Sequence, residues 1–586
     1  MRNRPTPGQS GKTSTTIINA VVALAFIAFC AVVVLYYFGA LDQGKVPPTA
    51  GPAEKPSSKV VKKPTGYLDI TFNSSSAKKR WIDQMAAKFN SEGLKTDGKT
   101  VRVTVHHDTS GGSYDALKAG KIKPDIWSPG DESWLHLAGE HWKEVRGKTL
   151  FDEYTPLVNI PLVIAMWEPM AKALGYPDPI GWKDIRKLAA NPDGWAALNR
   201  PEWGKFRWGH AHPDANSGFL AVISMVYAPL GKVEGITVED LRKPEVQSFL
   251  REFEGAVEHY GLSNSWIDDL MHSRGPSYLS AAVQYENTII ETNEKHGNSP
   301  FKLVAIYPTE GAFWTQHPAA VINEEWMTPE KRKACTLFID FLVSEKAQRA
   351  AREMGLRPIS NAGEISAPFD ADHGVKQDIA GDKKFQVPSQ EVLKRIRDLW
   401  ENVKAPATIS LLLDRSGSMR GKPLESAKEG AIRFIKAMKP RDQLEVVIFN
   451  HQVQVLTPFC LVRNCAEQAM SRIDEVFAEG ETALYDAVDR SYLRLLELQK
   501  KDPKRRYGMI VLSDGVDNHS LTGRHDFLDK LPKQEDFGAP KIFTIAYGTK
   551  ADQDLLKRIS NRTNARLFKS SSTEIIETYR ELSANF

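Results

Sequence analysis

One short stretch of this sequence carries side chains that could hold a metal ion. The apolar run Ile409–Leu413 leads into Asp414, and two hydroxyl residues, Ser416 and Ser418, follow at alternate positions. Apolar residues without alternation are typical of a strand buried on both faces of a parallel sheet, and such sheets bind ligands at the carboxyl ends of their strands. The spacing lets both hydroxyls face the same way as the carboxylate. An oxygen-only set of this kind suits Mg²⁺ better than zinc or copper.

Two later segments add oxygen ligands of the same type. The segment Gly480–Ala487 places Thr482 at a predicted helix start, and a second apolar strand, Met509–Ser513, ends at Asp514. The sequence therefore reads Asp-x-Ser-x-Ser, then Gly-x-Thr-Ala-Leu-Tyr-Asp-Ala, then Leu-Ser-Asp-Gly. This order resembles the von Willebrand factor type A domain.

The resemblance implies a metal-ion-dependent adhesion site holding Mg²⁺ or Mn²⁺. It implies direct ligation by the three hydroxyls, a role through bound water for the two aspartates, and an acidic residue of a partner protein at the open position. Any one of these pieces alone is also explained by turns and helix caps. The expected metal residues are Asp414, Ser416, Ser418, Thr482 and Asp514.

Two catalytic alternatives fail on particular residues. A phosphoryl-transferring aspartate at Asp414 needs a second aspartate two positions later, where Ser416 stands. A Walker loop ending at Gly11-Lys12-Thr13 lacks its first glycine, since that position is Thr6. Neither a catalytic triad nor a set of zinc ligands appears at usable spacing. We expect a binding protein rather than an enzyme; a metal-dependent hydrolase is the least favoured alternative.

Length and composition predict several globular domains. With 586 residues, 41% hydrophobic and 26% charged, the chain is too long for one domain and has globular composition. The net charge of +4 is small for this length, so nothing argues for nucleic acid.

The amino-terminal region predicts a membrane anchor. Residues 1–16 are basic, and the apolar run over residues 17–41, about 25 residues, is long enough to span a bilayer. Its exit, Tyr36–Ala40, is aromatic where signal cleavage needs small residues. We expect an uncleaved transmembrane helix with a cytoplasmic amino-terminus. Residues 42–65 then form a disordered tether, and the bulk of the chain lies outside the membrane, in the periplasm or at the cell surface.

Residues 66–360 alternate between strand and helix patterns. Small polar clusters precede three predicted helices: Ser74–Ser76, Gly111–Ser113 and Asn216–Gly218. Helix starts offer free N–H groups and a positive dipole end, so several clusters converging on one cleft would bind an oxyanion or a carboxylate. Ordinary helix capping explains each cluster equally well.

The order of these pieces, with Tyr285-Glu286 after a strand and Tyr307-Pro308 after another, resembles the bacterial extracellular solute-binding proteins. The resemblance implies a bilobal fold of the type II periplasmic-binding-protein kind, with a small solute held between the lobes; the helix-start clusters favour an anionic one. The solute contacts that it implies are Ser75, Ser128, Ser217, Tyr285 and Tyr307, and the helix-start cluster adds Asn216.

The remaining chain completes an α/β architecture. Residues 361–404 predict a connector that includes a helix over 389–403, and residues 405–586 predict a Rossmann-like, doubly wound von Willebrand type A domain. Cys460 and Cys465 either pair in an oxidising compartment or stay as two free thiols near a helix start.

Together these patterns predict a membrane-anchored extracytoplasmic binding protein. In this interpretation the first domain binds a small solute, and the second makes Mg²⁺-dependent contacts with a partner protein in a receptor, adhesion or assembly role. The alternative is a substrate receptor that docks on an ABC-type importer.

Overall fold

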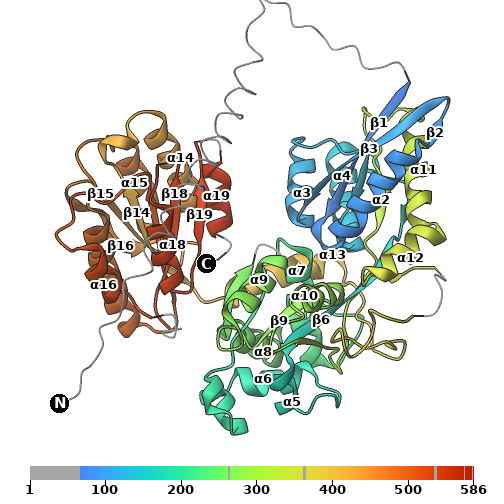
Figure 1. The fold of residues 1–586 in the computed structure, drawn as a ribbon, viewed down its shortest axis with the longest axis horizontal. Coiled ribbons are helices and arrows are strands. Elements are labelled where there is room, and N and C mark those ends of the chain that lie inside the picture. Colours follow the sequence, from blue (N-terminus) through green and yellow to red (C-terminus); the bar gives the residue numbers. More distant parts are fainter. Residues whose placement is uncertain are drawn as a thin grey trace, which may run out of the picture. The chain divides into compact units, whose positions relative to one another are not determined.

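The computed structural model describes residues 66–261, 264–360, 365–533, 538–548, 550–572, 574–583 and 585. Within these ranges the chain forms three sheets of six, seven and six strands, each covered by helices (Figure 1). The predicted amino-terminus, membrane span and tether, residues 1–65, lie outside the described part. No described helix is long and apolar enough to cross a membrane.

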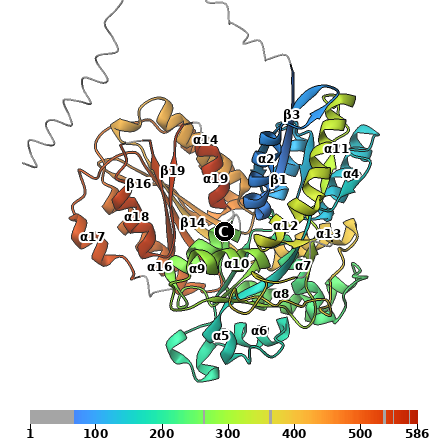
Figure 2. The ribbon, with the colours of Figure 1, turned by 45° about the vertical axis from the view of Figure 1, so that its right-hand side comes forward.

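The first sheet brings the carboxyl ends of two parallel strands together. β1 pairs with β4, and this pairing sets Ser74 opposite Ser128. Helices α2 (Lys79–Glu92) and α11 (Pro329–Val343) pack beside β1 and β3 (Figure 2). The strand order is β2 (Lys95–Thr96), β3 (Lys99–Asp108), β1 (Tyr67–Ser75), β4 (Ile126–Ser128), β12 (Ala319–Val321) and β5 (Tyr154–Thr155).

The second sheet is mixed and forms the other lobe. Its strand β6 (Val158–Trp167) is antiparallel to both neighbours, β10 (Leu303–Ile306) and β9 (Ala281–Tyr285). Leu162 pairs with Tyr285, the last residue of β9, and helix α10 (Glu286–Lys295) begins directly after it. The strand order is β10 (Leu303–Ile306), β6 (Val158–Trp167), β9 (Ala281–Tyr285), β7 (Trp208–Ala211) and β8 (Val257–Gly261), with β11 (Trp314–Thr315) and β13 (Arg357–Pro358) also on β6. The chain enters this sheet after β5 and returns to the first at β12, so the domain is bilobal.

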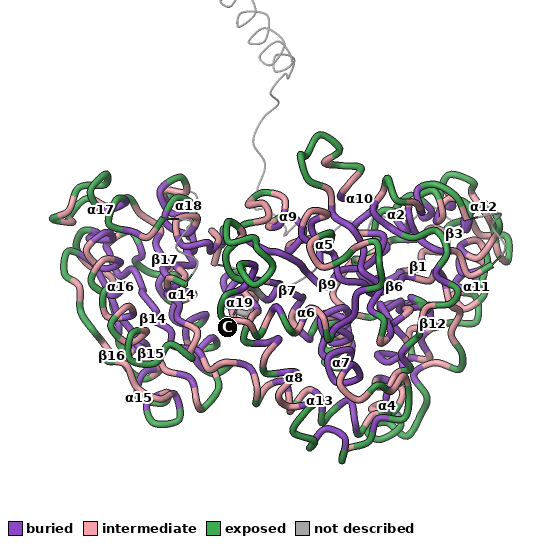
Figure 3. Tube along the Cα trace, turned by 90° about the horizontal axis from the view of Figure 1, so that it is seen from below, coloured by how far each residue is buried: buried purple, intermediate pink, exposed green. Residues whose placement is uncertain are grey.

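One helix of the second lobe is buried almost throughout. Helix α7 (Asn216–Leu230) is apolar on all sides, as expected for a helix enclosed by protein, and its trace is buried over most of its length (Figure 3). Helices α8 (Pro244–Gly255) and α13 (Gln390–Val403) pack against it. The predicted connector helix is therefore part of this domain, with Val392, Ile396 and Trp400 buried in its core.

The third sheet is doubly wound, as predicted. Five strands are parallel and the edge strand β16 is antiparallel. Its strand order is β16 (Val453–Leu461), β15 (Gln443–Phe449), β14 (Ala407–Asp414), β17 (Arg506–Ser513), β18 (Lys541–Tyr547) and β19 (Leu567–Ser570). One face packs on α14 (Lys422–Ala437), α15 (Val462–Asp474) and α19 (Ile575–Ser583). The other packs on α16 (Leu484–Lys501), α17 (Arg524–Lys530) and α18 (Gln553–Arg562).

The sequence left two states open for one cysteine pair, and the structure forms a disulfide between Cys460 and Cys465. Cys460 lies near the end of β16 and Cys465 in the first turn of α15, with Cα atoms 6.3 Å apart. The bond therefore ties the edge strand to the helix that follows it. Cys335 is a free, buried cysteine of α11.

Candidate metal site and solute cleft

The predicted metal residues lie at the carboxyl edge of the third sheet. β14 and β17 are parallel neighbours, and Leu413 is in register with Leu512. Asp414 is the last residue of β14, whereas Asp514 directly follows β17. Parallel pairing therefore brings the two aspartates, 100 positions apart in the numbering, to one edge.

Asp414 is held in one orientation by its neighbours. The Ser416 amide donates to Oδ1 at 2.8 Å, and the Ser513 hydroxyl donates to Oδ2 at 2.6 Å. The side chain is fully buried. Burial raises the pKa of Asp414 to about 6, although these hydrogen bonds act in the opposite direction. Burial removes water from around the Asp414 carboxylate. A cation bound nearby would stabilise its charged form.

Three hydroxyl and carboxylate oxygens form a chain beside Asp414. The Ser416 and Ser418 Oγ atoms are 3.1 Å apart, and the Ser418 hydroxyl donates to Oδ1 of Asp514 at 2.7 Å. Burial also raises the pKa of Asp514. Arg415 points elsewhere, since its guanidinium pairs with Glu479 at 2.9 Å.

Thr482 completes the set from the loop before α16. Its amide donates to Asn518 Oδ1 at 2.8 Å, and its carbonyl accepts the amides of Asn518 and His519. A Cβ atom placed on Gly515 would lie 3.5 Å from Thr482 Oγ1 and 3.7 Å from Ser418 Oγ. The two hydroxyls thus flank one gap that glycine keeps open. Hydroxyl and carboxylate oxygens around such a gap fit a hard divalent cation.

The sequence analysis missed the supporting residues of this site. Ser513 belongs to the motif Leu-Ser-Asp-Gly and was treated as the end of a strand, yet its hydroxyl holds Asp414. Asn518 fixes the Thr482 loop. A serine at the last position of a buried strand, one residue before a candidate ligand, was the available signal for the first of these.

The solute domain contains a cavity of about 300 Å³. Four of the six predicted contact residues line it: Ser75, Asn216, Ser217 and Tyr285. The cluster at Gly111 differs in detail, because α3 (Ser110–Lys118) begins earlier than predicted and includes it. The Thr109 hydroxyl caps that helix by accepting from the Gly112 amide at 3.1 Å.

Asn216 connects the two lobes at this cavity. Its Oδ1 accepts from the indole of Trp134, in α4 (Glu132–Arg146) of the first lobe, at 2.8 Å. Its Nδ2 donates to the Tyr285 hydroxyl at 2.8 Å. Ser217 donates to Asn264 Oδ1 at 2.6 Å, which ties α7 to α9 (Asn264–Arg274). Hydrogen bonds between side chains therefore fix the positions of Asn216 and Ser217 at this cavity.

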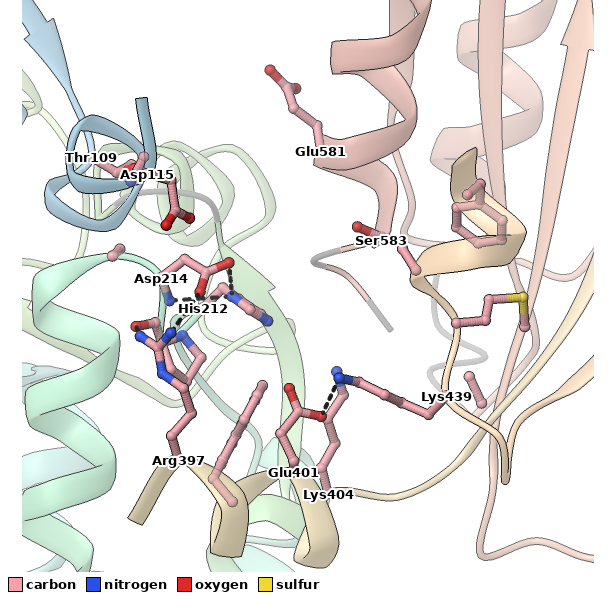
Figure 4. Close-up of a pocket in the computed structure, with 18 of the residues that line it drawn as sticks. Thr109, Asp115, His212, Asp214, Arg397, Glu401, Lys404, Lys439, Glu581 and Ser583 are labelled. Carbon is pink, nitrogen blue, oxygen red and sulfur yellow. Dashed lines mark hydrogen bonds and ion pairs between the residues drawn. The ribbon is translucent and has the colours of Figure 1, made fainter. Parts of the chain in front are cut away.

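A second contact joins the lobes at the edge of the domain. The Gly111 amide donates to the Asp214 carbonyl at 3.1 Å. Figure 4 shows the Asp214 carboxylate between His212 and Arg397, which lie 3.2 Å and 3.8 Å from its oxygens. The segment before α7 is thus held by the first lobe and by α13.

The structure does not bring the other two predicted contact residues to the cavity lining. Ser128 is buried behind it, and its carbonyl accepts from Lys78. The Tyr307 hydroxyl donates to Glu286, which also forms a bidentate pair with Arg357 at 2.7 and 2.8 Å. Tyr307 therefore lies in a buried ion-pair network, because β10 pairs with β6 on the side away from β9.

Lys78 and His317 contact the cavity residue Ser75, and the sequence analysis missed both. Lys78 is 1% exposed, and its ammonium donates to Ser75 Oγ at 2.9 Å and to the Ser128 carbonyl at 3.0 Å. Among the described residues no carboxylate pairs with it. Ser75 Oγ also lies 3.2 Å from Nδ1 of the buried His317. Burial lowers the pKa of His317, and the charge of Lys78 adds to this effect. Lysine is nearly always exposed, so the sequence held no signal that Lys78 is buried.

Comparison with known proteins agrees with both folds. Residues 70–357 match the family model described as bacterial extracellular solute-binding protein, and residues 409–516 match the model of the von Willebrand factor type A domain. The described part of the chain thus contains two domains that these family models match. It carries a bacterial extracellular solute-binding domain followed by a von Willebrand factor type A domain, as both resemblances implied.

Individual relatives cover only parts of the chain. The uncharacterized protein sll0103 of Synechocystis is 30% identical over 180 residues, which is 30% of this chain and 41% of that protein. The inter-alpha-trypsin inhibitor heavy chain H4 of Sus scrofa is 22% identical over 193 residues, 32% of this chain and 21% of that protein. The chain therefore spans less than half the length of these relatives.

Two solved structures have similar parts. The periplasmic binding protein P5PA is 17% identical, with a TM-score of 0.40 over 57% of this chain and 98% of that one. A von Willebrand factor type A protein from Catenulispora acidiphila is 18% identical, with a TM-score of 0.28 over 31% of this chain and 42% of that one.

Proposed function

We propose that this protein is a membrane-anchored extracytoplasmic receptor in which one domain binds a small anionic solute and the other binds a partner protein through a divalent cation. The solute-binding and von Willebrand type A domains support ligand binding and protein interaction as the general roles. The membrane span over residues 17–41 is part of the proposal on sequence grounds alone.

The convergence of five oxygen-bearing side chains at one sheet edge carries the proposal for the second domain. Ser416, Ser418 and Thr482 would ligate Mg²⁺ or Mn²⁺, with Asp414 and Asp514 acting largely through water. When bound, the cation supplies an open coordination position to a carboxylate of the partner. The chain's own residues orient the site: Ser513 holds Asp414, and Asn518 holds the Thr482 loop.

For the solute domain, two helix starts at the cavity support an oxyanion or a carboxylate. Helices α7 and α10 both begin at the cavity, and neither has a side-chain cap, so their first N–H groups are left for a ligand. The buried Lys78 amine donates to Ser75 Oγ, and burial lowers the pKa of Lys78 well below its usual value. Charge-assisted bonds to an anion are short and strong.

A pull-down from membranes tests the receptor role. The full chain, bearing an affinity tag, is incubated with solubilised membranes in Mg²⁺ or in chelator. We expect a partner protein that is retained in Mg²⁺, is released by chelator and is absent with Asp514→Ala. The matched control is Asp526→Ala, which changes an exposed aspartate of α17. Retention of the same partners by Asp514→Ala and in chelator contradicts the metal-dependent contact.

A further inference from the structure

The cavity of the solute domain has a second, acidic wall. Helices α9 and α10 contribute Asp268, Asp269 and Glu291 to its lining, and Lys295 is the basic residue that these helices add. Asp269 is paired with Lys295 at 3.4 Å. Glu291 forms no salt bridge among the described residues. Two carboxylates of this wall are therefore left without a lysine or arginine partner.

Asp268 has an unused acceptor at the cavity. It is only 7% exposed, and its Oδ2 accepts the Thr292 hydroxyl at 2.6 Å. Its Oδ1 accepts no hydrogen bond in the described part of the chain; the nearest basic atom is His272 Nδ1 at 3.6 Å, which instead bonds the Asp268 carbonyl. A buried carboxylate oxygen without a donor is costly to maintain, so a partner is missing.

Two neighbouring asparagines, Asn287 and Asn264, each have one amide atom that is bonded and one that is unpartnered in the described residues. Asn287 donates from Nδ2 to the Ala77 carbonyl at 3.0 Å, and its buried Oδ1 is unpartnered in the described residues. Asn264 accepts from Ser217 through Oδ1, and its buried Nδ2 is unpartnered. Asp268 and Asn287, each with an unpartnered acceptor, thus line the same cavity as Asn264, which has an unpartnered donor, and as the starts of α7 and α10.

We propose that the cleft takes a small zwitterion, a molecule with an ammonium group for Asp268, Asn287 and Glu291 and an anionic group for the helix starts near Lys78. This inference rests on the proposed function, since it keeps the anionic end and adds a cationic one. A simple inorganic oxyanion leaves the acceptors of the acidic wall unpaired, whereas an ammonium donates to them directly. A cavity of about 300 Å³ holds a compact molecule with both groups.

Calorimetry with matched probe pairs tests the proposal. The full chain is titrated with β-alanine and propionate, taurine and ethanesulfonate, and 2-aminoethylphosphonate and ethylphosphonate. Each pair shares its anionic group and differs in the amine. Since a hydrogen bond to a charged group contributes strongly, we expect the amine-bearing member of at least one pair to bind about tenfold or more tightly than its partner.

The variant Asp268→Asn keeps the shape and removes the charge. We expect it to reduce that preference to less than about threefold while the amine-free member binds as before. Asp178→Asn, the same change at an exposed site away from the cavity, should retain the preference. If Asp268→Asn fails to fold by circular dichroism, Glu291→Gln is used, with the same expected direction.

The outcomes separate this inference from the proposed function. Equal affinity for both members of every pair, or an undiminished preference in the variant, overturns the zwitterion and leaves an anion receptor. Binding by no member of the panel overturns both.

Discussion

The Ser418 hydroxyl donates to Oδ1 of Asp514 at 2.7 Å, although 96 positions separate the two residues. This bond joins the loop after β14 to the loop after β17. Because Ser418 also lies 3.1 Å from Ser416 Oγ, the three residues form one continuous polar edge. A cation bound there would compete with this bond for the same oxygens.

Mg²⁺ or Mn²⁺ should stabilise the protein. A cation that binds only the folded state adds about 2.7 kcal/mol at a concentration one hundred times its dissociation constant. We expect the thermal midpoint of the full chain, followed by calorimetry, to rise with Mg²⁺, and Asp514→Ala to remove the rise. Asp526→Ala should preserve it. An equal rise in wild type and Asp514→Ala would falsify the assignment of the metal residues.

The membrane topology is tested by cysteine labelling. Because residues 17–41 are predicted to span the bilayer with the amino-terminus inside, Ser57→Cys should react with an impermeant maleimide once the outer barrier is opened. The matched variant Ser10→Cys should react only after the cells are lysed. A mature protein that begins near Gly44, found by amino-terminal sequencing, contradicts the uncleaved anchor.

Ser217 should tolerate loss of its hydroxyl but not added bulk. Ser217→Ala removes one neutral hydrogen bond, to Asn264, and should weaken solute binding by about 0.5 to 1.5 kcal/mol. Ser217→Trp places an indole in the cavity and should abolish binding. Ser224→Ala, which alters a serine of the same helix outside the cavity, should bind normally. Calorimetry with the probe that binds best measures the affinity of all three variants. If Ser217→Trp keeps full affinity, Ser217 does not belong to the solute site.

Stability should depend on pH through Asp131, the residue that caps α4. Burial raises the pKa of Asp131 from 3.8 to about 6. The folded state therefore holds a proton that the unfolded state has lost, so the wild type loses stability as pH rises from about 4 to about 6. Asp131→Asn removes this loss and still accepts from the Ser133 amide.

Relative to wild type, Asp131→Asn should gain about 2 to 3 kcal/mol of stability between pH 4 and pH 7.5, since one pKa unit corresponds to about 1.4 kcal/mol. Urea unfolding at both values measures the gain. Asp178→Asn, an exposed control, should show no such dependence. If the unfolding free energy of Asp131→Asn changes with pH as that of the wild type does, the result argues against a buried charge on Asp131.

The candidate metal site was largely predictable because the residues that form it lie in local sequence patterns. Strands that are apolar without alternation end at Asp414 and Asp514, and parallel pairing brings such ends together. The disulfide was not predictable in this way. The spacing of Cys460 and Cys465 fits a bond or two thiols, and only the junction of β16 with α15 decides between them.

The solute cleft was predictable in part, because its residues depend on contacts between distant segments. Ser75, Asn216 and Ser217 lie at strand or helix ends that the pattern revealed. Tyr307 also follows a predicted strand, but the strand order places its hydroxyl against Glu286 and not at the cavity. Lys78, in contrast, was not predicted to lie at the site. Lysine is nearly always exposed, so no local pattern indicated a buried one.

The bond between the Trp134 indole and Asn216 gives the solute domain an intrinsic optical probe. Trp134 is buried, and its partner belongs to the other lobe. Separation of the lobes would break this bond and admit water to the ring, which moves tryptophan emission to longer wavelengths. Any separation of the lobes could therefore be followed by fluorescence in the unlabelled protein, with Trp134→Phe identifying the contribution of this one chromophore.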